Sequence, residues 1–324
     1  EPGVYDDYKS RLREELEEQI LPDGMHYERS PMYHKIVLED LMRAARGVEK
    51  ADRLFYEELC KKIKKMADVM YSLEDGMGQT PLFNDSGDNV ARSMVSLLAA
   101  LREEFGITPD YKASFPDAGY YCLRSGDVKV LLDAGAIAPD YMPGHGHCDG
   151  LSFELSRQGH PVFVNSGTGM YQGALRGYFR STAAHNTVMI GDKNSSEVWG
   201  GFRVGRRARV TLLKDSPNEV EAWHDGFGSL GRHQRKFMID KDRFRIEDSV
   251  STAVKAVSLI HLAPDVEIIS CSRNEIVTNI AAIRMAGASS VEVADEQVSF
   301  TYNRFHLSKT IRIHFVKRLS YTIG

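Results

Sequence analysis

The sequence predicts an α+β protein in which a helical domain, residues 1–115, precedes an antiparallel β-sandwich domain, residues 116–324. Two observations lead to this prediction. Apolar residues recur at helical spacing in the first part of the chain, and short strand-like segments bounded by turn residues fill the second. The chain has 324 residues, and single hydrophobic cores usually stop growing below that length, so we expect two packed units.

Four helices are expected in the first 115 residues. The stretch Val4–Ile20 carries apolar residues on one face and charge on the other. A second helix begins after Ser30, because serine caps helix N-termini and the proline that follows is tolerated in the first turn, where Tyr33 then lies. Amphipathic stretches over 52–73 and 87–105 predict the third and fourth helices. Their short connections favour antiparallel hairpins.

After residue 115 the helical spacing of apolar residues gives way to a strand-like pattern. Short segments read as strands between turn residues, and many of them contain β-branched or aromatic side chains. The expected strands include 120–124, 128–133, 151–155, 162–164, 187–190, 210–213, 237–239, 243–250, 256–262 and 310–315.

Composition excludes several classes of protein. Formal net charge is −4, whereas a nucleic-acid-binding domain is usually markedly basic. No apolar run approaches the length of a membrane span. The four cysteines lie far apart without a CxxC pair, so they indicate neither a disulfide framework nor a thiolate zinc site. The chain begins at Glu1 without an initiator methionine and soon enters a helical pattern, which suggests a fragment of a longer protein.

The most informative segment is GHGHCDG at 144–150. If this segment is extended, alternation points His145, His147 and Asp149 to one face. Two imidazoles two residues apart suit a metal site, a proton-transfer site, or both. The spacing alone is equally compatible with a pair of surface histidines.

Two further polar residues lie at the ends of expected strands. His185 comes just before one strand, and Asn165 ends another. A lone histidine is more often a buried, hydrogen-bonded residue than a ligand, and a polar residue at a strand end is usually part of a turn. Neither position indicates a function by itself.

An ordered set of motifs resembles the heparinase II/III family of polysaccharide lyases. The motifs GHGHCDGLSFEL, VFVNSGTGMY, YFRSTAAHNTV and SEVWGGFRVGRRA resemble the C-terminal region of the family, and the earlier DGMHYERSPMYH resembles its tyrosine-bearing segment. Together they cover about residues 20 to 250. The resemblance implies a partial α/α-toroid for the helical domain and β-elimination of uronic-acid-containing glycans.

The resemblance also implies roles for single residues. Tyr33 would be the catalytic tyrosine and His145 the catalytic histidine. His147 and His185 would be ligands of a zinc ion. The third ligand in zinc-containing relatives is an aspartate, where this chain has Asn165. A neutral amide oxygen is a weaker zinc ligand than a carboxylate, so this departure weakens the implied site.

β-Elimination requires a charge neutraliser, a base and an acid. A tyrosine with a depressed pKa can take the proton and return one to the leaving oxygen, which is the role expected for Tyr33. His145 would act as the base when the proton and the leaving group lie on opposite faces of the sugar, and would otherwise position the substrate. In the family an Asn-His or similar pair upstream of the tyrosine neutralises the carboxylate. The residues before Tyr33 contain no asparagine, so this pair is expected before Glu1.

Five residues are candidate substrate contacts: His26, Glu28, Arg180, Trp199 and Arg203. The first two flank the tyrosine, although ordinary solvation at a helix start explains them equally well. Guanidinium groups fit carboxylates or sulfates, but arginines on a solvated strand face are just as common. The tryptophan would stack on a sugar ring or pack into the protein.

The leading hypothesis is therefore a lyase acting on an acidic polysaccharide. The alternative is a non-catalytic module that binds acidic glycans or assists polysaccharide biosynthesis and retains a degenerate lyase site. A zinc hydrolase is a third reading, but the sequence has no HExxH motif. The expected partner is the polysaccharide, with no nucleic acid and no membrane span, and a homodimer is left open. The resemblance suggests a periplasmic or secreted location.

Overall fold

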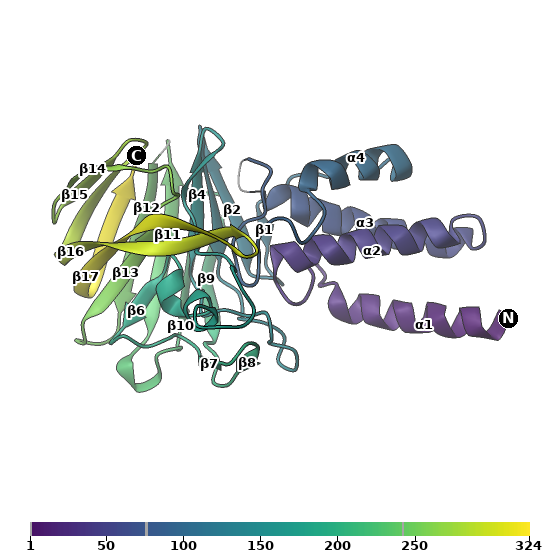
Figure 1. Cartoon of the computed structure of the whole chain (residues 1–324), viewed down its shortest axis with the longest axis horizontal. Helices are drawn as coiled ribbons and strands as arrows, with labels where there is room; N and C mark the ends of the chain where they lie inside the picture. The colour runs from purple at the N-terminus through teal and green to yellow at the C-terminus, as the bar shows by residue number, and fades with distance from the viewer. Residues whose placement is uncertain (1, 75–76, 242) are drawn as a thin grey trace.

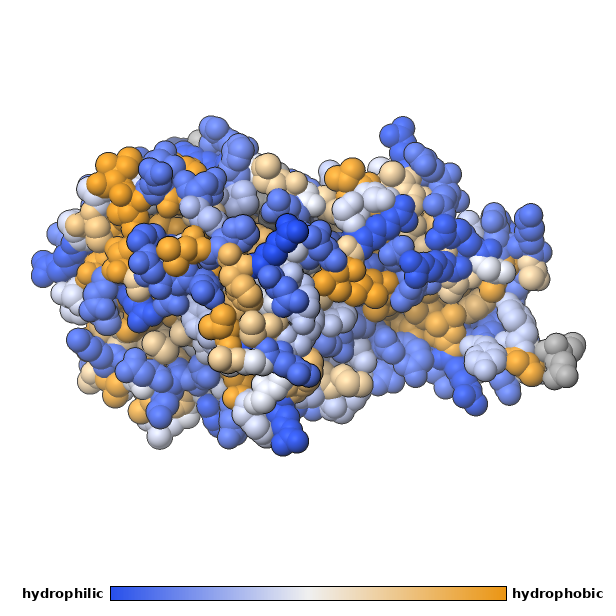
Figure 2. Space-filling model, in the orientation of Figure 1, coloured by the Kyte–Doolittle hydropathy of each residue, from blue (hydrophilic) through white to orange (hydrophobic). Residues whose placement is uncertain are grey.

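The computed structural model describes the chain except for residues 1, 75–76 and 242 and the side chain of Pro2. Helices form one end of an elongated molecule and two antiparallel sheets form the other, with the N-terminus at the helical end (Figure 1). Hydrophilic side chains are spread over both parts in the view of Figure 2, with apolar ones interspersed. None of the helices in the described residues has both the length and the hydropathy needed to cross a membrane.

Four long helices make up the first part: α1 Pro2–Gln19, α2 Pro31–Val48, α3 Arg53–Ser72 and α4 Met94–Phe105. The Ser30 hydroxyl caps α2 by accepting a hydrogen bond from the Tyr33 backbone N–H, as the sequence predicts. The prediction that the fourth helix begins at residue 87 is wrong. Ser93 caps α4 through the Ser96 N–H, and the loop before it supplies residues of the site described below.

The helices share an apolar core of their own. Leu38 and Met42 of α2, Leu59 and Ile63 of α3 and Leu97 of α4 are all fully buried in it. The amphipathic pattern of the sequence therefore gave the right inward faces. The described helices do not establish a toroid, so that part of the fold stays a prediction, as does the domain boundary at residue 115.

The second part contains a five-stranded and a ten-stranded antiparallel sheet. The small sheet has the order β1 Ser114–Phe115, β2 Tyr120–Ser125, β3 Val128–Asp133, β4 Phe153–Arg157, β5 His160–Phe163. The main path of the large sheet is β14 Ile268–Cys271, β15 Glu275–Thr278, β16 Ala282–Thr301, β17 Arg304–Ile323, β12 Arg243–Val250, β11 His233–Asp240, β10 Glu219–His224, β9 Val210–Ser216. β13 Ala256–His261 also pairs with β17, and β6 Val188–Ile190 pairs with β13.

Short elements connect these sheets. They are the helix α5 Arg176–Phe179, the 3-10 turns η1 Thr182–Ala184 and η2 Gly228–Leu230, and the hairpin of β7 Val198–Trp199 with β8 Arg203–Val204. All four cysteines are free thiols, so no disulfide links the elements.

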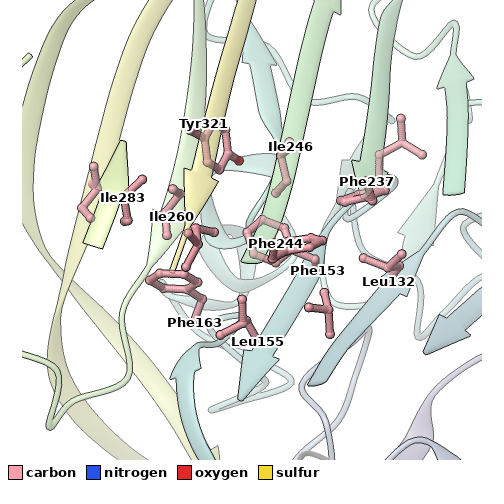
Figure 3. Packing of buried hydrophobic residues seen from close by; sticks show 14 of the residues in the cluster. Leu132, Phe153, Leu155, Phe163, Phe237, Phe244, Ile246, Ile260, Ile283 and Tyr321 are labelled. Carbon is pink, nitrogen blue, oxygen red and sulfur yellow. The ribbon is translucent and has the colours of Figure 1, made fainter. Parts of the chain in front are cut away.

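The two sheets pack face to face around one hydrophobic core (Figure 3). The Phe153 ring of the small sheet lies 5.5 Å from the Phe244 ring and 6.2 Å from the Phe237 ring of the large sheet. Along β11 and β12 buried residues alternate with more exposed ones, so one face of the large sheet is apolar and the other meets solvent. The predicted combination of helices and antiparallel sheet is confirmed.

The hairpin of β16 and β17 is much longer than the other strand pairs (Figure 1). Its tip reaches past the sandwich to two loops. The Ser299 N–H donates to the Ser166 carbonyl at 2.9 Å, and the Asn303 N–H donates to the Gly169 carbonyl at 2.9 Å. On the other side, the Asp88 N–H donates to the Phe300 carbonyl at 2.6 Å. The hairpin tip thus holds the loops that precede α4 and follow β5.

Candidate active site

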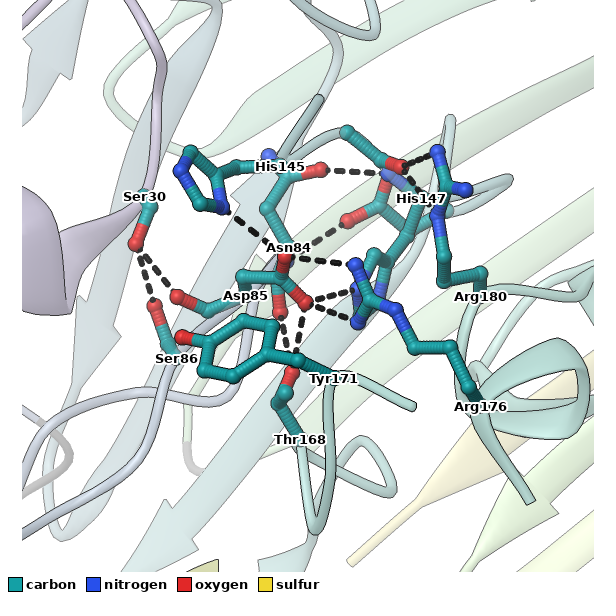
Figure 4. A network of polar contacts seen from close by, with 12 residues as sticks. Ser30, Asn84, Asp85, Ser86, His145, His147, Thr168, Tyr171, Arg176 and Arg180 are labelled. Atoms are coloured by element: carbon teal, nitrogen blue, oxygen red, sulfur yellow. Dashed lines mark hydrogen bonds and ion pairs between the residues drawn. The ribbon is translucent and has the colours of Figure 1, made fainter. Parts of the chain in front are cut away.

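A fully buried carboxylate, Asp85, lies at the centre of the polar network in Figure 4. His145 Nδ1 is 2.9 Å from its Oδ2, and His147 Nε2 is 2.8 Å from its Oδ1. The Arg176 guanidinium donates to both carboxylate oxygens, with Nη2 2.7 Å from Oδ2. The Thr168 hydroxyl donates to Oδ1 at 3.1 Å. The sequence analysis did not single out Asp85, although it holds both histidines of the GHGHCDG motif.

The network keeps Asp85 ionised. Burial is the largest influence on its pKa and would raise it, but hydrogen bonds from His145, His147 and Arg176 together hold the pKa well below its ordinary value. Burial lowers the pKa of His147 to about 4, against the opposing effect of Asp85. At neutral pH an anionic carboxylate therefore accepts hydrogen bonds from a neutral His147 and a cationic arginine.

The loop between α3 and α4 brings Asp85 to the histidines. Asn84 adopts a left-handed conformation, with φ 54°, and its backbone N–H donates to Asp149 Oδ2 at 3.1 Å. Its side-chain oxygen accepts the His147 N–H at 2.9 Å. Residues 144–150 form no strand, so the condition for placing His145, His147 and Asp149 on one face by alternation is not met. Asp149 instead accepts the hydrogen bond that holds the loop.

Tyr33 and His145 lie face to face, although they come from different parts of the fold. Their ring centroids are 4.0 Å apart, with an angle of 33° between the planes. Tyr33 is in the first turn of α2, and the Ser30 hydroxyl that caps this helix also donates to the Asp85 carbonyl at 2.6 Å. The helix start is therefore tied to the loop that holds the imidazole.

A second tyrosine meets the first. The hydroxyl oxygens of Tyr33 and Tyr171 are 3.0 Å apart. Burial raises the pKa of Tyr33 above its ordinary value of 10, while the hydrogen bond from Tyr171 acts in the opposite direction. Burial also raises the pKa of Tyr171. The expectation of a depressed Tyr33 pKa is therefore wrong, and both phenols carry protons at neutral pH. Tyr171 belongs to the VFVNSGTGMY motif, but the sequence analysis gave it no role.

Aromatic side chains border the site. The Tyr171 ring lies 5.8 Å from the Phe202 ring and 5.5 Å from the Tyr302 ring, and His145 lies 5.9 Å from Phe202. Phe202 and Tyr302 are 45% and 39% exposed. Tyr302 is at the tip of the β16–β17 hairpin, so that hairpin contributes to the rim of the site.

His26 and Glu28, predicted as substrate contacts, lie close to this centre. The backbone N–H of His26 donates to the ring of His34 at 3.2 Å, and burial lowers the His26 pKa to about 3. Burial raises the Glu28 pKa, and an imidazolium at His145 would lower it in opposition, so this carboxyl is within the electrostatic reach of the site. Their contact with substrate stays a prediction.

The other three predicted contacts lie in different surroundings. Arg180 is almost fully buried, and its Nε and Nη2 donate to the Gly146 carbonyl at 3.2 and 3.1 Å. This burial argues against direct contact with a polymer. Trp199 and Arg203 face each other across the β7–β8 hairpin, and Trp199 is 47% exposed. Phe202, next to Arg203 in the chain, is the residue of this hairpin that contacts the His145 ring.

Whether His147, His185 and Asn165 could bind zinc depends on which of their side-chain atoms have no hydrogen-bond partner. The rings of His147 and His185 are 5.3 Å apart and fully buried. His147 Nδ1 and both ring nitrogens of His185 have no hydrogen-bond partner among the described residues. Asn165 Oδ1 accepts the Asn186 backbone N–H at 3.1 Å, which leaves the amide nitrogen of Asn165 as the buried atom without a partner.

This arrangement does not fit zinc as the side chains stand. The two imidazoles offer lone pairs, but the free amide group of Asn165 is a hydrogen-bond donor and not a ligand. Within the residues that the structure describes, no group of three or more His, Cys, Asp or Glu side chains could hold a metal ion. The chain offers two of the ligands that zinc requires, and the zinc site stays a prediction.

Comparison with known proteins identifies relatives along the whole chain. The profile of the heparinase II/III-like C-terminal region matches residues 108–323, and that of the heparinase II/III N-terminus matches residues 8–112. A heparin-sulfate lyase of Bacteroides thetaiotaomicron is 26% identical over an alignment of 298 positions that covers 76% of this chain and 41% of the relative. A heparin-sulfate lyase of Pedobacter heparinus is 24% identical over an alignment of 211 positions that covers 57% of this chain and 32% of the relative.

Solved structures share the fold. A heparinase III gene product superposes with a TM-score of 0.83 at 19% identity, over 99% of this chain and 55% of that protein. The heparan sulfate lyase HepC of Pedobacter heparinus gives a TM-score of 0.78 at 19% identity, over 97% of this chain and 55% of that protein. The chain thus spans less than half of the first curated relatives and about half of these structures. The match to the C-terminal profile alone exceeds half of the sequence, and the chain belongs to the heparinase II/III family.

Proposed function

We propose that this chain carries the acid–base centre of a polysaccharide lyase that cleaves uronic-acid-containing acidic glycans by β-elimination. The observation behind the proposal is the contact between the Tyr33 and His145 rings, whose centroids are 4.0 Å apart. A phenol and an imidazole at this distance can exchange protons with two different atoms of one sugar, the carbon next to the carboxylate and the glycosidic oxygen. The names of the relatives, heparin-sulfate lyases, favour a heparan-type polymer as the substrate.

His145 is the base in this proposal. Its Nδ1 lies 2.9 Å from Asp85 Oδ2, so the proton resides on Nδ1 and the lone pair on Nε2. Proton transfer to Nε2 creates an imidazolium, which the ionised Asp85 stabilises. The proton removed is the one next to the uronate carboxylate.

Tyr33 is the acid. Burial raises its pKa, so the phenol keeps its proton until the leaving group needs it. As the carbon–carbon double bond forms, the bond to the glycosidic oxygen breaks, and Tyr33 supplies a proton to that oxygen. Tyr171, at 3.0 Å, donates a hydrogen bond to the resulting phenolate. The sugar thus loses one proton to His145, and the leaving oxygen gains one from Tyr33.

Two arginines position these groups. The Arg176 guanidinium binds both oxygens of Asp85 and lies 5.3 Å from the Tyr171 ring centroid, so one side chain holds the partners of both reacting residues. Arg180 binds the carbonyl of Gly146, between the two histidines. We assign it a positioning role in place of the predicted contact with substrate.

The test uses the full-length protein with heparan sulfate and other uronide polymers. Turnover creates an unsaturated uronide that absorbs in the ultraviolet. Tyr33→Phe is expected to lower kcat about 10²- to 10⁴-fold, the usual contribution of a general acid. Tyr8→Phe removes the hydroxyl of a tyrosine that is 68% exposed on α1 and should leave kcat unchanged.

The alternative is a glycan-binding module without turnover, and Asn165 is the feature that favours it, because it departs from the family pattern. Polymer affinity measured beside turnover separates the two functions. A protein that binds heparan sulfate without shortening it, whether or not Tyr33 is intact, contradicts the lyase proposal.

A further inference from the structure

The solvent face of the large sheet contains a long groove. Two adjoining hollows, of about 540 and 530 Å³, share the residues Gln234, Ser249 and Arg318 and together form what we call the sheet groove. Its other lining residues come from β9, β10, β11, β12, β16 and β17 and from the turns beside them.

Strand register gives the groove its direction. Trp223 of β10 pairs with Gln234 of β11, which pairs with Ser249 of β12, which pairs with Arg318 of β17. These four residues form a row across four strands, roughly 14 Å long, because neighbouring strands lie about 4.8 Å apart. Ligands that fill such a row are extended chains.

The floor of the groove is lined by small residues where the backbone bends. Ser249 and Ser320 lie beside Ala286 and Gly287, where the register of β16 against β17 shifts. Gly287 has φ 95°, and a Cβ added there would come within 2.5 Å of the Arg318 carbonyl oxygen. The hollow therefore follows from the backbone and not from the rotamer of one surface side chain.

Positive charge predominates along the groove. Five cations line it: Arg232, Lys236, Arg245, Lys317 and Arg318. Glu221 and Glu247 oppose them, whereas the third carboxylate, Asp248, is buried and bound to Arg235. Arg245 pairs with Glu247 at 2.6 Å and Lys236 with Glu219 at 2.9 Å.

Three of these cations are available to a ligand. Arg232, Lys317 and Arg318 form no ion pair with a carboxylate of the described residues. The whole chain carries a formal charge of −4, so this local excess of cations is opposite in sign to the rest of the protein. A groove of this charge is complementary to an anionic ligand.

The chemistry between the cations narrows the class of ligand. Ser249, Ser320 and Gln234 line the groove beside the charged groups, and their polar atoms can bind sugar hydroxyls, although the Gln234 amide also donates to Glu221 Oε1 at 2.6 Å. Trp223 provides an apolar surface at one end, with the Arg232 guanidinium 4.3 Å from its ring centroid. A chain that carries carboxylates or sulfates together with hydroxyl groups is complementary to this combination of cations and polar side chains.

We propose that the sheet groove binds a stretch of anionic polysaccharide at a distance from the acid–base centre. This inference takes the class of polymer from the proposed function. Phe237 and Phe244 of β11 and β12 point into the core, so the groove is on the opposite face, turned away from the small sheet (Figures 1 and 3). A polymer held there remains attached between cleavage events, which raises its local concentration at the centre.

Binding is tested with heparin and full-length protein carrying Tyr33→Phe, by calorimetry at about 0.15 M salt. Arg318→Glu is expected to weaken heparin binding about tenfold, since it replaces an available cation with an anion at the β17 end of the row, where the two hollows meet. The matched control is Arg273→Glu, an exposed arginine between β14 and β15 that makes the same change of charge outside the groove. It should alter affinity less than about twofold.

Two further measurements make the result decisive. With Tyr33 intact, Arg318→Glu should raise KM for long heparan sulfate while kcat and KM for a tetrasaccharide stay the same. Equal effects of the Arg318 and Arg273 variants overturn the inference, and so does poly-glutamate that competes as well as heparin. Should Arg318→Glu fail to fold, Arg232→Ala at the other end of the row replaces it. If the native protein cleaves no uronide but Arg318→Glu still weakens heparin binding more than Arg273→Glu does, the proposed function is refuted and the groove inference stands.

Discussion

At the scale of single residues, the geometry of the site depends most on Asp85, whose carboxylate contacts His145, His147 and Arg176. Asp85→Asn removes the charge that stabilises an imidazolium at His145, so kcat should fall about 10²- to 10⁴-fold. The same change leaves Arg176 buried without a counter-charge, so the free energy of unfolding should fall by about 3–5 kcal/mol. Uronide turnover and urea unfolding measure the two effects.

Asp40→Asn is the control, since Asp40 is 63% exposed and pairs with Arg43 on the surface of α2. It should change stability by less than about 0.5 kcal/mol and leave kcat unaltered. Equal turnover of the Asp85 variant and the native protein would show that the carboxylate has no part in the reaction.

Asn165 provides a second test at this scale. Asn165→Asp replaces a donor group with a carboxylate beside two imidazoles that have free nitrogens, and should raise zinc affinity at least about tenfold. Zinc retained after dialysis and calorimetric titration measure the change. A variant that retains no more zinc than the native chain would count against a shared metal position for His147 and His185.

Some of the residues of the site could be predicted from the sequence, and others could not. Tyr33, His145, His147 and His185 stand in motifs long enough to be matched to a family. Asp85 lies in a run of turn-forming residues, Asn84 to Gly87, where an aspartate is ordinary. Its importance arises from partners 60 to 91 residues away in the chain, and no local pattern encodes such contacts.

At the scale of secondary structure, the start of α2 links folding to function. Ser30 caps this helix and also binds the Asp85 carbonyl, so Ser30→Ala should lower the free energy of unfolding by about 1–2 kcal/mol. Because Tyr33 is in the first turn, kcat should fall as well. Ser93→Ala removes the cap of α4, which does not carry reacting groups, and should cost about 1 kcal/mol of stability without a change in kcat. Equal kcat losses in both variants, measured at matched folded fractions, would refute the link.

Helices were predicted correctly where the sequence contains a clear cap or amphipathic pattern. The cap at Ser30 placed the start of α2 at the observed residue, and the amphipathic pattern over 52–73 placed both ends of α3 within one residue of their observed positions. The start of α4 was placed too early, because residues 87–93 continue an amphipathic pattern but are held in a loop by contacts such as that of Asp88 with Phe300. The spacing of the 144–150 segment could not decide its conformation, and the structure shows a turn-containing segment whose His147 N–H donates to Asn84 Oδ1.

At the scale of the whole molecule, buried histidines make the fold sensitive to acid. Burial lowers the pKa of His34 and His147 to about 4 and that of His26 and His261 to about 3. In the unfolded chain these histidines bind protons near pH 6.5, whereas in the folded chain they stay neutral until about pH 4. The folded state therefore has its full stability above pH 6.5 and loses stability as the pH falls toward 4. Each histidine should lower the free energy of unfolding by about 1 kcal/mol per pH unit in this window.

Thermal unfolding from pH 7.5 to 4.5 measures this loss. His34→Gln, in which one neutral polar side chain replaces another, should have a shallower dependence on pH than the native protein. His306→Gln, an exposed histidine on β17, should retain the native slope. A melting temperature that stays constant between pH 7 and 5 would contradict the assignment of these imidazoles as neutral.

The long hairpin of β16 and β17 has a consequence for biosynthesis. Its tip contacts the loops that carry Asp88, Ser166 and Gly169, yet it is synthesised more than 120 residues after the later of these loops. Contacts of such large sequence separation form late and slowly, because a long loop must close before they contribute. A nascent chain therefore contains Tyr33 and His145 long before the hairpin tip can hold the loops around them. A chain cut before Arg304 would contain both reacting groups but would lack the complete hairpin that holds these loops.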